Sequence, residues 1–238
     1  MQIGAAAGPA GRLLAWLGGA AFVASLATGA WCYTVRFGAP GGSSGGRLHP
    51  IAFDVFLFSG FALHHSLMAR TGVKRWLMQR VSPALERSLY VWIASALFAV
   101  TCLAWREIPG VAYDAPGPWR YVCLGVQLAG VWLTIRAAKI IDVLDLAGIR
   151  QAQGRTRPPV FQVIGPYHLV RHPIYLGWAL MTFGAPTMTG TRLAFAVIST
   201  AYLALAVPFE ERSLVEAFGD EYLEYQRRVR WRMIPGLY

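Results

Sequence analysis

Long apolar segments separated by short charged ones dominate the chain. Four segments contain no charged side chain over 17 to 23 residues: 13–35, 88–105, 174–191 and 193–209. Two more are less pure, since 51–69 includes one aspartate and two histidines, and 119–149 begins apolar and ends with four charged residues. A bilayer span requires about 17–25 apolar residues. The pattern therefore predicts an all-α integral membrane protein with five to six transmembrane helices, the last two forming a helical hairpin.

Composition agrees with this prediction, because only 14% of the residues are charged and 55% are apolar. The net charge of +10 first suggests a nucleic-acid partner, but the cations cluster in alternate loops. The clustered arginines and lysines are Arg70, Lys74, Arg75, Arg80, Arg87, Arg150, Arg155, Arg157, Arg171, Arg212, Arg227, Arg228, Arg230 and Arg232. This alternation follows the positive-inside rule. It predicts that both termini are cytoplasmic and that no nucleic acid is bound.

The three cysteines, Cys32, Cys102 and Cys123, lie in apolar segments without paired spacing. Such spacing supports neither a disulfide framework nor a zinc site. We expect them to serve packing, and we expect no metal.

Charges of unexpected sign stand at the two ends of the last hairpin. Arg171 and His172 precede an apolar helix, although the positive end of a helix dipole favours carboxylates. Glu210 and Glu211 follow the returning helix, whose end favours cations. One interpretation is a structural salt bridge between Arg171 and one of the glutamates. The other is a zwitterionic ligand, whose carboxylate meets Arg171, His172 and the amides of the helix start, and whose cationic group meets the glutamates.

The motifs GPYHLVRHPIYLG (165–177) and EERSLVEAFGDEYLEYQRRV (210–229) resemble the C-terminal signature of the isoprenylcysteine carboxyl methyltransferase and phospholipid methyltransferase superfamily. These are integral membrane enzymes that use S-adenosylmethionine, itself a zwitterion. The resemblance implies a set of cofactor-binding residues, with Val160 beside them. They are Gln151, Phe161, Gln162, Tyr167, Arg171, His172, Pro173, Tyr175, Glu210 and Glu211.

Three motifs in the front half of the chain resemble a smaller group within this superfamily. LHHSLMARTGVKRWL (63–77), LERSLYVWIAS (85–95) and IIDVLDLAGIRQ (140–151) resemble the bacterial methanethiol S-methyltransferases and a sister group linked to nitric oxide reductase. This chain departs from the pattern Ile-Asp-His-Phe-Asp-Leu-Phe-Gly at Val143, Leu144 and Ala147. The resemblance implies a protein of the bacterial inner membrane. The apolar pattern and the short loops predict one membrane domain over 1–238, with four spans in 13–147 and a cofactor-binding loop, hairpin and amphipathic cytoplasmic tail in 148–238.

His65 and Asp142 are the candidate catalytic residues, because a thiol acceptor reacts as its thiolate and a nearby base favours that form. Adjacent histidines on a helix point about 100 degrees apart, so at most one of His64 and His65 faces a pocket. The alternative for the histidine is a bond to a neighbouring helix. The alternative for Asp142 is an ion pair with Lys139, three residues earlier.

Three classes of function fit these features. The first is methylation of a small thiol, the second is methylation of a lipidic acceptor such as a prenylcysteine carboxylate or a phospholipid amine, and the third is a non-enzymatic accessory protein or transporter. In prenylcysteine enzymes the resemblance places an arginine one turn before the glutamates, where this chain has Ala206. A carboxylate without a cation is costly in a low-dielectric site. We therefore expect a small thiol acceptor, unless Arg136 or Lys139 replaces the missing cation. The sequence does not indicate an oligomeric state.

Overall fold

A computed structural model describes residues 6–41, 46–68, 79–82, 84–155 and 160–238. Contacts divide the chain into two interleaved units, one made of 1–37, 48–106 and 141–158, and the other of 38–47, 107–140 and 159–238. Within these residues, five helices are long and apolar enough to cross a membrane, which confirms an all-α membrane protein. Part of the LHHS motif and the cations Arg70, Lys74, Arg75 and Arg157 lie outside the described residues.

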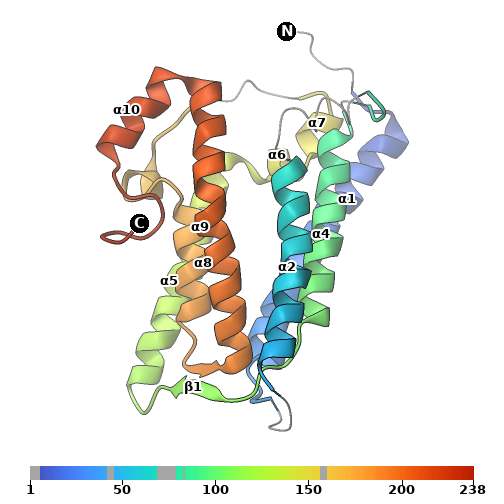
Figure 1. The fold of residues 1–238 in the computed structure, drawn as a ribbon. Helices are drawn as coiled ribbons and strands as arrows, with labels where there is room; N and C mark the ends of the chain where they lie inside the picture. Colours follow the sequence, from blue (N-terminus) through green and yellow to red (C-terminus); the bar gives the residue numbers. More distant parts are fainter. Residues whose placement is uncertain (1–5, 42–45, 69–78, 83, 156–159) are drawn as a thin grey trace. The chain divides into compact units, whose positions relative to one another are not determined.

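The described residues of the first unit form three long helices and two short ones, shown in Figure 1. They are α1 (Pro9–Trp31, continued by a π-helical turn Cys32–Arg36), α2 (Leu48–Met68), α4 (Glu86–Ala104), α6 (Val143–Leu146) and α7 (Ile149–Ala152). Glycines let α1 approach α4 closely, since a Cβ at Gly29 would lie 2.8 Å from the Phe98 ring. Small residues serve such close helix contacts in membranes. Cys32 and Cys102 are buried free thiols in this packing, as expected.

The span expected over 119–149 is shorter in the structure. Helix α5 (Trp119–Ile141) ends where Asp142 adopts a positive φ of 67°. The Asp142 side chain accepts a hydrogen bond from the Leu144 amide and caps α6. An aspartate can bond its own backbone in this way and tolerates a left-handed φ, so it can end one helix and begin the next.

The described residues of the second unit form α5 and five further helices and strands. They are β1 (Val111–Asp114), α8 (Pro173–Phe183), β2 (Thr187–Thr189), α9 (Gly190–Phe218) and α10 (Asp220–Arg228), with a 3-10 turn at Gly165–His168. Helices α5 and α8 approach at two glycines. A Cβ at Gly130 would lie 2.6 Å from the Gly177 carbonyl oxygen, so only glycine allows this contact.

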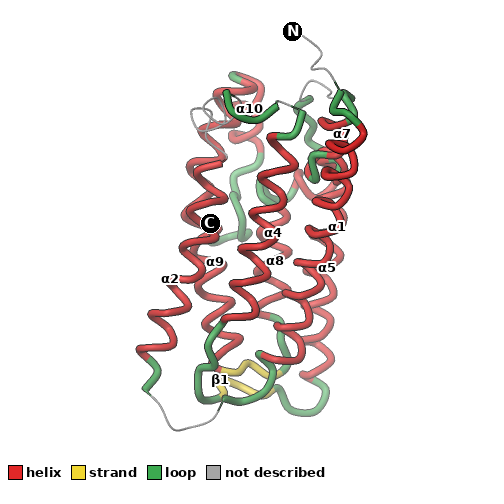
Figure 2. Tube along the Cα trace, turned by 90° about the vertical axis from the view of Figure 1, so that its right-hand side faces the viewer, coloured by secondary structure: helices red, strands yellow, loops and turns green. Residues whose placement is uncertain are grey.

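The hairpin differs from the uniform helix expected over 174–191. Helix α8 has only 11 residues, about 16 Å of rise, or half a bilayer core. Gly184 caps it and Pro186 follows, so the helix cannot continue. The chain proceeds as the short strand β2, paired antiparallel with β1 and drawn in yellow in Figure 2. This pairing provides hydrogen-bond partners for the extended backbone that joins α8 to α9.

Helix α9 carries the chain from β2 to the glutamates. Gly190 and Glu210 are 20 residues apart, about 30 Å of helix, which matches the thickness of a bilayer core. Gly219 then turns the chain at a φ of 57°, and α10 follows. Gly219, rather than the aspartate at 220, is the N-cap of α10.

Candidate functional site

The centre of the candidate site is a buried ion pair between Arg171 and Glu211. The arginine Nε lies 2.6 Å from Oε1 of the glutamate, and the side chains are 7% and 5% exposed. A second nitrogen, Nη2, donates to Oε2 at 3.3 Å, so the pair is bidentate. The remaining terminal nitrogen, Nη1, donates to the carbonyl oxygens of Val229 and Arg230 at 2.6 and 3.0 Å. The salt-bridge interpretation of the sequence therefore holds for these two residues.

Glu210 has a different environment from its neighbour. Its side chain is 37% exposed, and its Oε2 lies 3.5 Å from Nδ1 of His172. The Tyr175 hydroxyl donates a hydrogen bond to its other oxygen. The His172 and Tyr175 rings stack at 5.3 Å with an angle of 13° between their planes. Glu210 is thus a positioned carboxylate that remains accessible, whereas Glu211 is enclosed.

The segment after α10 completes the cluster. The backbone amides of Arg171 and His172 donate to the carbonyls of Trp231 and Arg232 at 3.0 and 2.8 Å. These two amides, which directly precede α8, are therefore occupied by the chain itself. Arg232 also pairs with Glu211 at 3.3 Å, and Gln226 donates to the same carboxylate at 3.2 Å.

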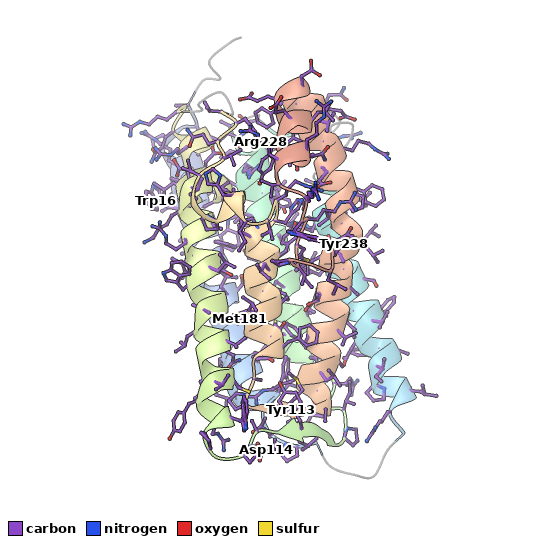
Figure 3. All side chains as sticks on the ribbon, turned by 90° about the vertical axis from the view of Figure 1, so that its left-hand side faces the viewer. Trp16, Tyr113, Asp114, Met181, Arg228 and Tyr238 are labelled. Atoms are coloured by element: carbon purple, nitrogen blue, oxygen red, sulfur yellow. The ribbon has the colours of Figure 1, made fainter. Side chains whose placement is uncertain are left out.

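Tyr238 links this segment to α9, and Figure 3 labels its position. Its hydroxyl donates to the Ala204 carbonyl at 3.0 Å and accepts from Arg232 at 3.3 Å. Pro208 stands four residues after Ala204 inside α9 and has no amide hydrogen, so the helix cannot bond this carbonyl itself. Tyr238 supplies the missing donor.

Aromatic residues lie beside the cluster. The Phe161 ring lies 5.3–5.6 Å from the rings of Phe218, Tyr222 and Tyr225. The Tyr225 hydroxyl donates to the Tyr167 carbonyl at 2.7 Å, which joins the 3-10 turn to α10. Burial raises the pKa of the Tyr167 hydroxyl to about 12, so the group stays neutral.

The second unit therefore brings together most of the cofactor-binding residues that the resemblance implied. Pro173 is the buried first residue of α8, between His172 and Tyr175. Gln162 and Val160 are exposed beside the half-buried Phe161. Gln151 lies in the first unit, where its side-chain oxygen accepts from the Arg87 amide at 3.2 Å. It caps the start of α4, since the first amides of a helix lack intrahelical partners.

His65, also in the first unit, forms a polar contact within the membrane. Its Nδ1 lies 2.5 Å from the Tyr90 hydroxyl of α4. The neighbouring His64 ring stacks on Tyr90 with an interplanar angle of 12°. The bond to a neighbouring helix that the sequence left as an alternative is thus present.

Asp142 pairs with Arg150 at 2.5 Å, eight residues later, rather than with Lys139. The side chains are 37% and 28% exposed. Desolvation raises the pKa of Asp142, but hydrogen bonds from Arg150 and Leu144 outweigh it, so the pKa lies below its ordinary value. A carboxyl group with a lowered pKa is a weaker base.

Sequence reasoning did not assign Gln226, Arg232, Tyr238 or Tyr90 to these contacts. One signal was present, because Pro208 within a helix indicates a carbonyl in need of a donor. Among the described residues, no group of histidine, cysteine, aspartate and glutamate side chains has the arrangement of a metal site.

These features define a helical integral membrane protein with a charged site at the end of a hairpin. Methanethiol S-methyltransferase 1 of Bradyrhizobium diazoefficiens is 37% identical over 185 residues, covering 75% of this chain and 65% of the relative. The Mycobacterium tuberculosis methanethiol S-methyltransferase is 37% identical, covering 75% of this chain and 76% of the relative. Nurim of Sus scrofa is 28% identical over 70% of this chain and 69% of its own length.

The chain thus spans about two thirds of the first relative and three quarters of the second. No family model and no solved structure matches it. The identity and coverage place the chain in the family of the methanethiol S-methyltransferases, which are membrane methyltransferases. This membership confirms the resemblance and favours an enzyme over a non-enzymatic accessory protein.

Proposed function

We propose that the protein is an S-adenosylmethionine-dependent methyltransferase that methylates a small thiol such as methanethiol. The observation that carries the proposal is the accessible Glu210 carboxylate, held by Tyr175 and His172 in a chain whose relatives bear that reaction in their names. We further propose a bacterial inner-membrane location with both termini cytoplasmic, on the distribution of cations.

The residues around Glu210 fit a zwitterionic cofactor. Glu210 offers a half-exposed negative charge for its cationic groups. The His172 ring stands between the two carboxylates, with Nδ1 3.5 Å from Oε2 of Glu210 and Nε2 3.5 Å from Oε1 of Glu211, so it holds Glu210 in place beside the cofactor. S-adenosylmethionine would supply a methyl group on a sulfonium sulfur, which an attacking thiolate accepts.

Arg171 and Glu211 support the site differently from the sequence expectation. The arginine uses its nitrogens on Glu211, Val229 and Arg230, so it positions the chain rather than presenting a free guanidinium. Glu211 is enclosed by Arg171, Arg232 and Gln226. We therefore assign ligand contact to Glu210, His172 and Tyr175, and a positioning role to Arg171 and Glu211.

For the base that generates the thiolate, the contacts favour His65 over Asp142. Asp142 is committed to Arg150 and has a lowered pKa. In the tautomer that donates from Nδ1–H to the Tyr90 oxygen, the His65 ring is oriented and Nε2 has a free lone pair to take the proton from the thiol sulfur. The thiolate would then be the nucleophile for the methyl group that bound S-adenosylmethionine supplies, whose sulfur would keep the electrons of the broken carbon–sulfur bond.

The acceptor is inferred to be small and neutral, because 201–209 holds no cation for a carboxylate substrate. The test is incubation of purified protein with labelled S-adenosylmethionine and methanethiol, with headspace detection of the sulfide. A farnesylated cysteine analogue runs beside it. We expect turnover of the thiol only, and methylation of the prenylated carboxylate alone would contradict the acceptor assignment.

A matched pair of variants tests the base. His65→Gln keeps a partner for Tyr90, and we expect turnover to fall about 100-fold or more while cofactor affinity is unchanged. His64→Gln and Asp142→Asn should retain turnover close to that of the unmodified protein. Full activity of His65→Gln would exclude His65 as the base.

A further inference from the structure

A cavity in the first unit is separate from every residue assigned above. It measures about 450 Å³ and is lined by Pro9, Arg12, Trp16, Gln153 and Arg155. The first three residues belong to the start of α1, and the last two follow α7. Two arginines from distant parts of the chain therefore meet at one opening.

Backbone contacts fix the walls of this cavity. The Ala7 amide donates to the Ala152 carbonyl at 2.9 Å, which ties the approach to α1 against the end of α7. Gly154 turns the chain at a φ of 67°, and a Cβ there would lie 3.2 Å from Ala6. The Arg155 amide then bonds the Arg150 carbonyl at 2.9 Å. The turn thus brings Arg155 to the cavity.

The cavity has positive charge and no counter-charge of its own. Among the described residues, neither Arg12 nor Arg155 forms an ion pair. The first turn of α1 contains no acidic residue, although the positive end of its dipole favours one. Two guanidinium groups at a helix start are complementary to an anion, because they add charge and donors to that end.

The position of the cavity along α1 indicates which class of anion it binds. Arg12 directly precedes the 23 charge-free residues of 13–35, so it marks the border of the apolar span. Trp16, labelled in Figure 3, lies one turn further and is 52% exposed. Tryptophan is enriched at this level of a membrane. Leu13 and Leu17 beside it are 60% and 49% exposed, which offers apolar surface for acyl chains.

We propose that this cavity binds the phosphate headgroup of an anionic phospholipid. Arg12 and Arg155 would hold the phosphate through paired N–H donors, for which the guanidinium geometry is suited. Trp16 lies at the level of the glycerol backbone, and the leucines line the first acyl carbons. Basic pockets between helices at a membrane surface bind such headgroups.

Native mass spectrometry of the full chain in detergent tests this site with three probes: phosphatidylglycerol, phosphatidylcholine and inorganic phosphate. We expect retention of phosphatidylglycerol, with weak retention of the other two. Arg12→Gln with Arg155→Gln should weaken phosphatidylglycerol binding about 30-fold, from the usual contribution of two arginines at an anionic surface.

The control is Arg227→Gln with Arg228→Gln, which removes two exposed charges from α10. This variant should bind phosphatidylglycerol within about twofold of the unmodified protein, since only non-specific attraction is reduced. Arg12→Lys with Arg155→Lys keeps the charge and should regain part of the affinity. Circular dichroism of each variant verifies that its helices remain.

Three results would overturn the proposal. The first is equal retention of phosphatidylglycerol and phosphatidylcholine. The second is equal loss in the control variant, which would indicate non-specific attraction. The third is arginine-dependent binding of inorganic phosphate without any preference for the lipid, which would assign the cavity to a soluble anion. None of these results depends on the proposed methyl transfer.

Discussion

Two of the ion pairs in the described chain, Arg171–Glu211 and Arg150–Asp142, have similar contact distances but different surroundings. Their closest contacts measure 2.6 and 2.5 Å. The first joins residues 40 apart in sequence and is at most 7% exposed. The second joins residues eight apart and is 28–37% exposed. Distance alone therefore does not indicate what a pair contributes.

Burial and the number of partners separate the two. Arg171 and Glu211 are also bonded by Arg232, Gln226 and two backbone carbonyls, so almost every polar atom is satisfied. A buried charge that loses its partner is costly, because water cannot replace it. An exposed ion pair adds little to stability, because water solvates both charges when the pair breaks. The buried cluster should thus fix the geometry of the site, and the exposed pair should act only locally.

The largest expected effect is the loss of one partner from the buried cluster. Glu211→Leu leaves Arg171 unpaired and should lower the free energy of unfolding by about 3–5 kcal/mol. Chemical unfolding in detergent, followed by circular dichroism, measures this. Arg171→Met combined with Glu211→Leu should cost less than the sum of the two single changes. Additive costs would show that the two residues are not coupled.

Glu210→Gln, next to Glu211 in the same turn of α9, should weaken cofactor binding without lowering stability. The side chain is half-exposed, so its change should leave the unfolding midpoint nearly constant. S-adenosylmethionine affinity should fall about 10- to 100-fold, as for loss of a hydrogen-bonded charge. Calorimetry with Tyr175→Phe as a companion variant measures this. An unchanged affinity in Glu210→Gln would remove the carboxylate from the binding site.

Tyr238→Phe should have a smaller effect, about 1 kcal/mol, because it removes one hydrogen bond from the Ala204 carbonyl. The matched background is Pro208→Ala, in which residue 208 can donate to that carbonyl. In this background, Tyr238→Phe should lower the free energy of unfolding by less than it does in the unmodified chain. A double-mutant cycle by chemical unfolding gives the difference, and equal costs in both backgrounds would argue against this link.

The exposed pair should show the smallest effect. Asp142→Asn and Arg150→Gln should leave the unfolding midpoint nearly unchanged. The folded-state pKa of Asp142 is lowered, so its contribution is present above the unfolded pKa of about 4 and is lost as the pH falls through the folded value. The difference in the free energy of unfolding between pH 7 and pH 3 should therefore be smaller in Asp142→Asn than in the unmodified protein. A midpoint shift as large as that of Glu211→Leu would contradict the comparison.

The hairpin illustrates why some elements could be predicted and others not. The apolar segment 193–209 lies within α9, because a charge-free run of that length satisfies its backbone in the membrane only as a helix. The run 174–191 became a short helix followed by a strand instead. Apolarity alone does not distinguish these outcomes, and Gly184 and Pro186 were the local signals that the helix ends.

The candidate site, like the hairpin, was predicted only in part. The opposite charges at 171–172 and 210–211 indicated a charged cluster at the end of the hairpin, because their signs oppose the helix dipoles. Which glutamate meets Arg171 was left open. Adjacent residues on a helix point in different directions, so the rotation of α9 against α8 decides that Glu211 is enclosed and Glu210 accessible.

The membrane class, the helical content and the hairpin with its charged ends could be predicted from the amino-acid order, since these depend on local hydrophobicity and on the order of charges. The part of 226–238 in the charged cluster could not, because it depends on how the chain packs. Arg232 reaches Glu211 and Tyr238 reaches Ala204 across 21 and 34 residues. The physical reason is that buried donors and acceptors must be satisfied, but any nearby polar group can satisfy them, and only the packed chain selects which one.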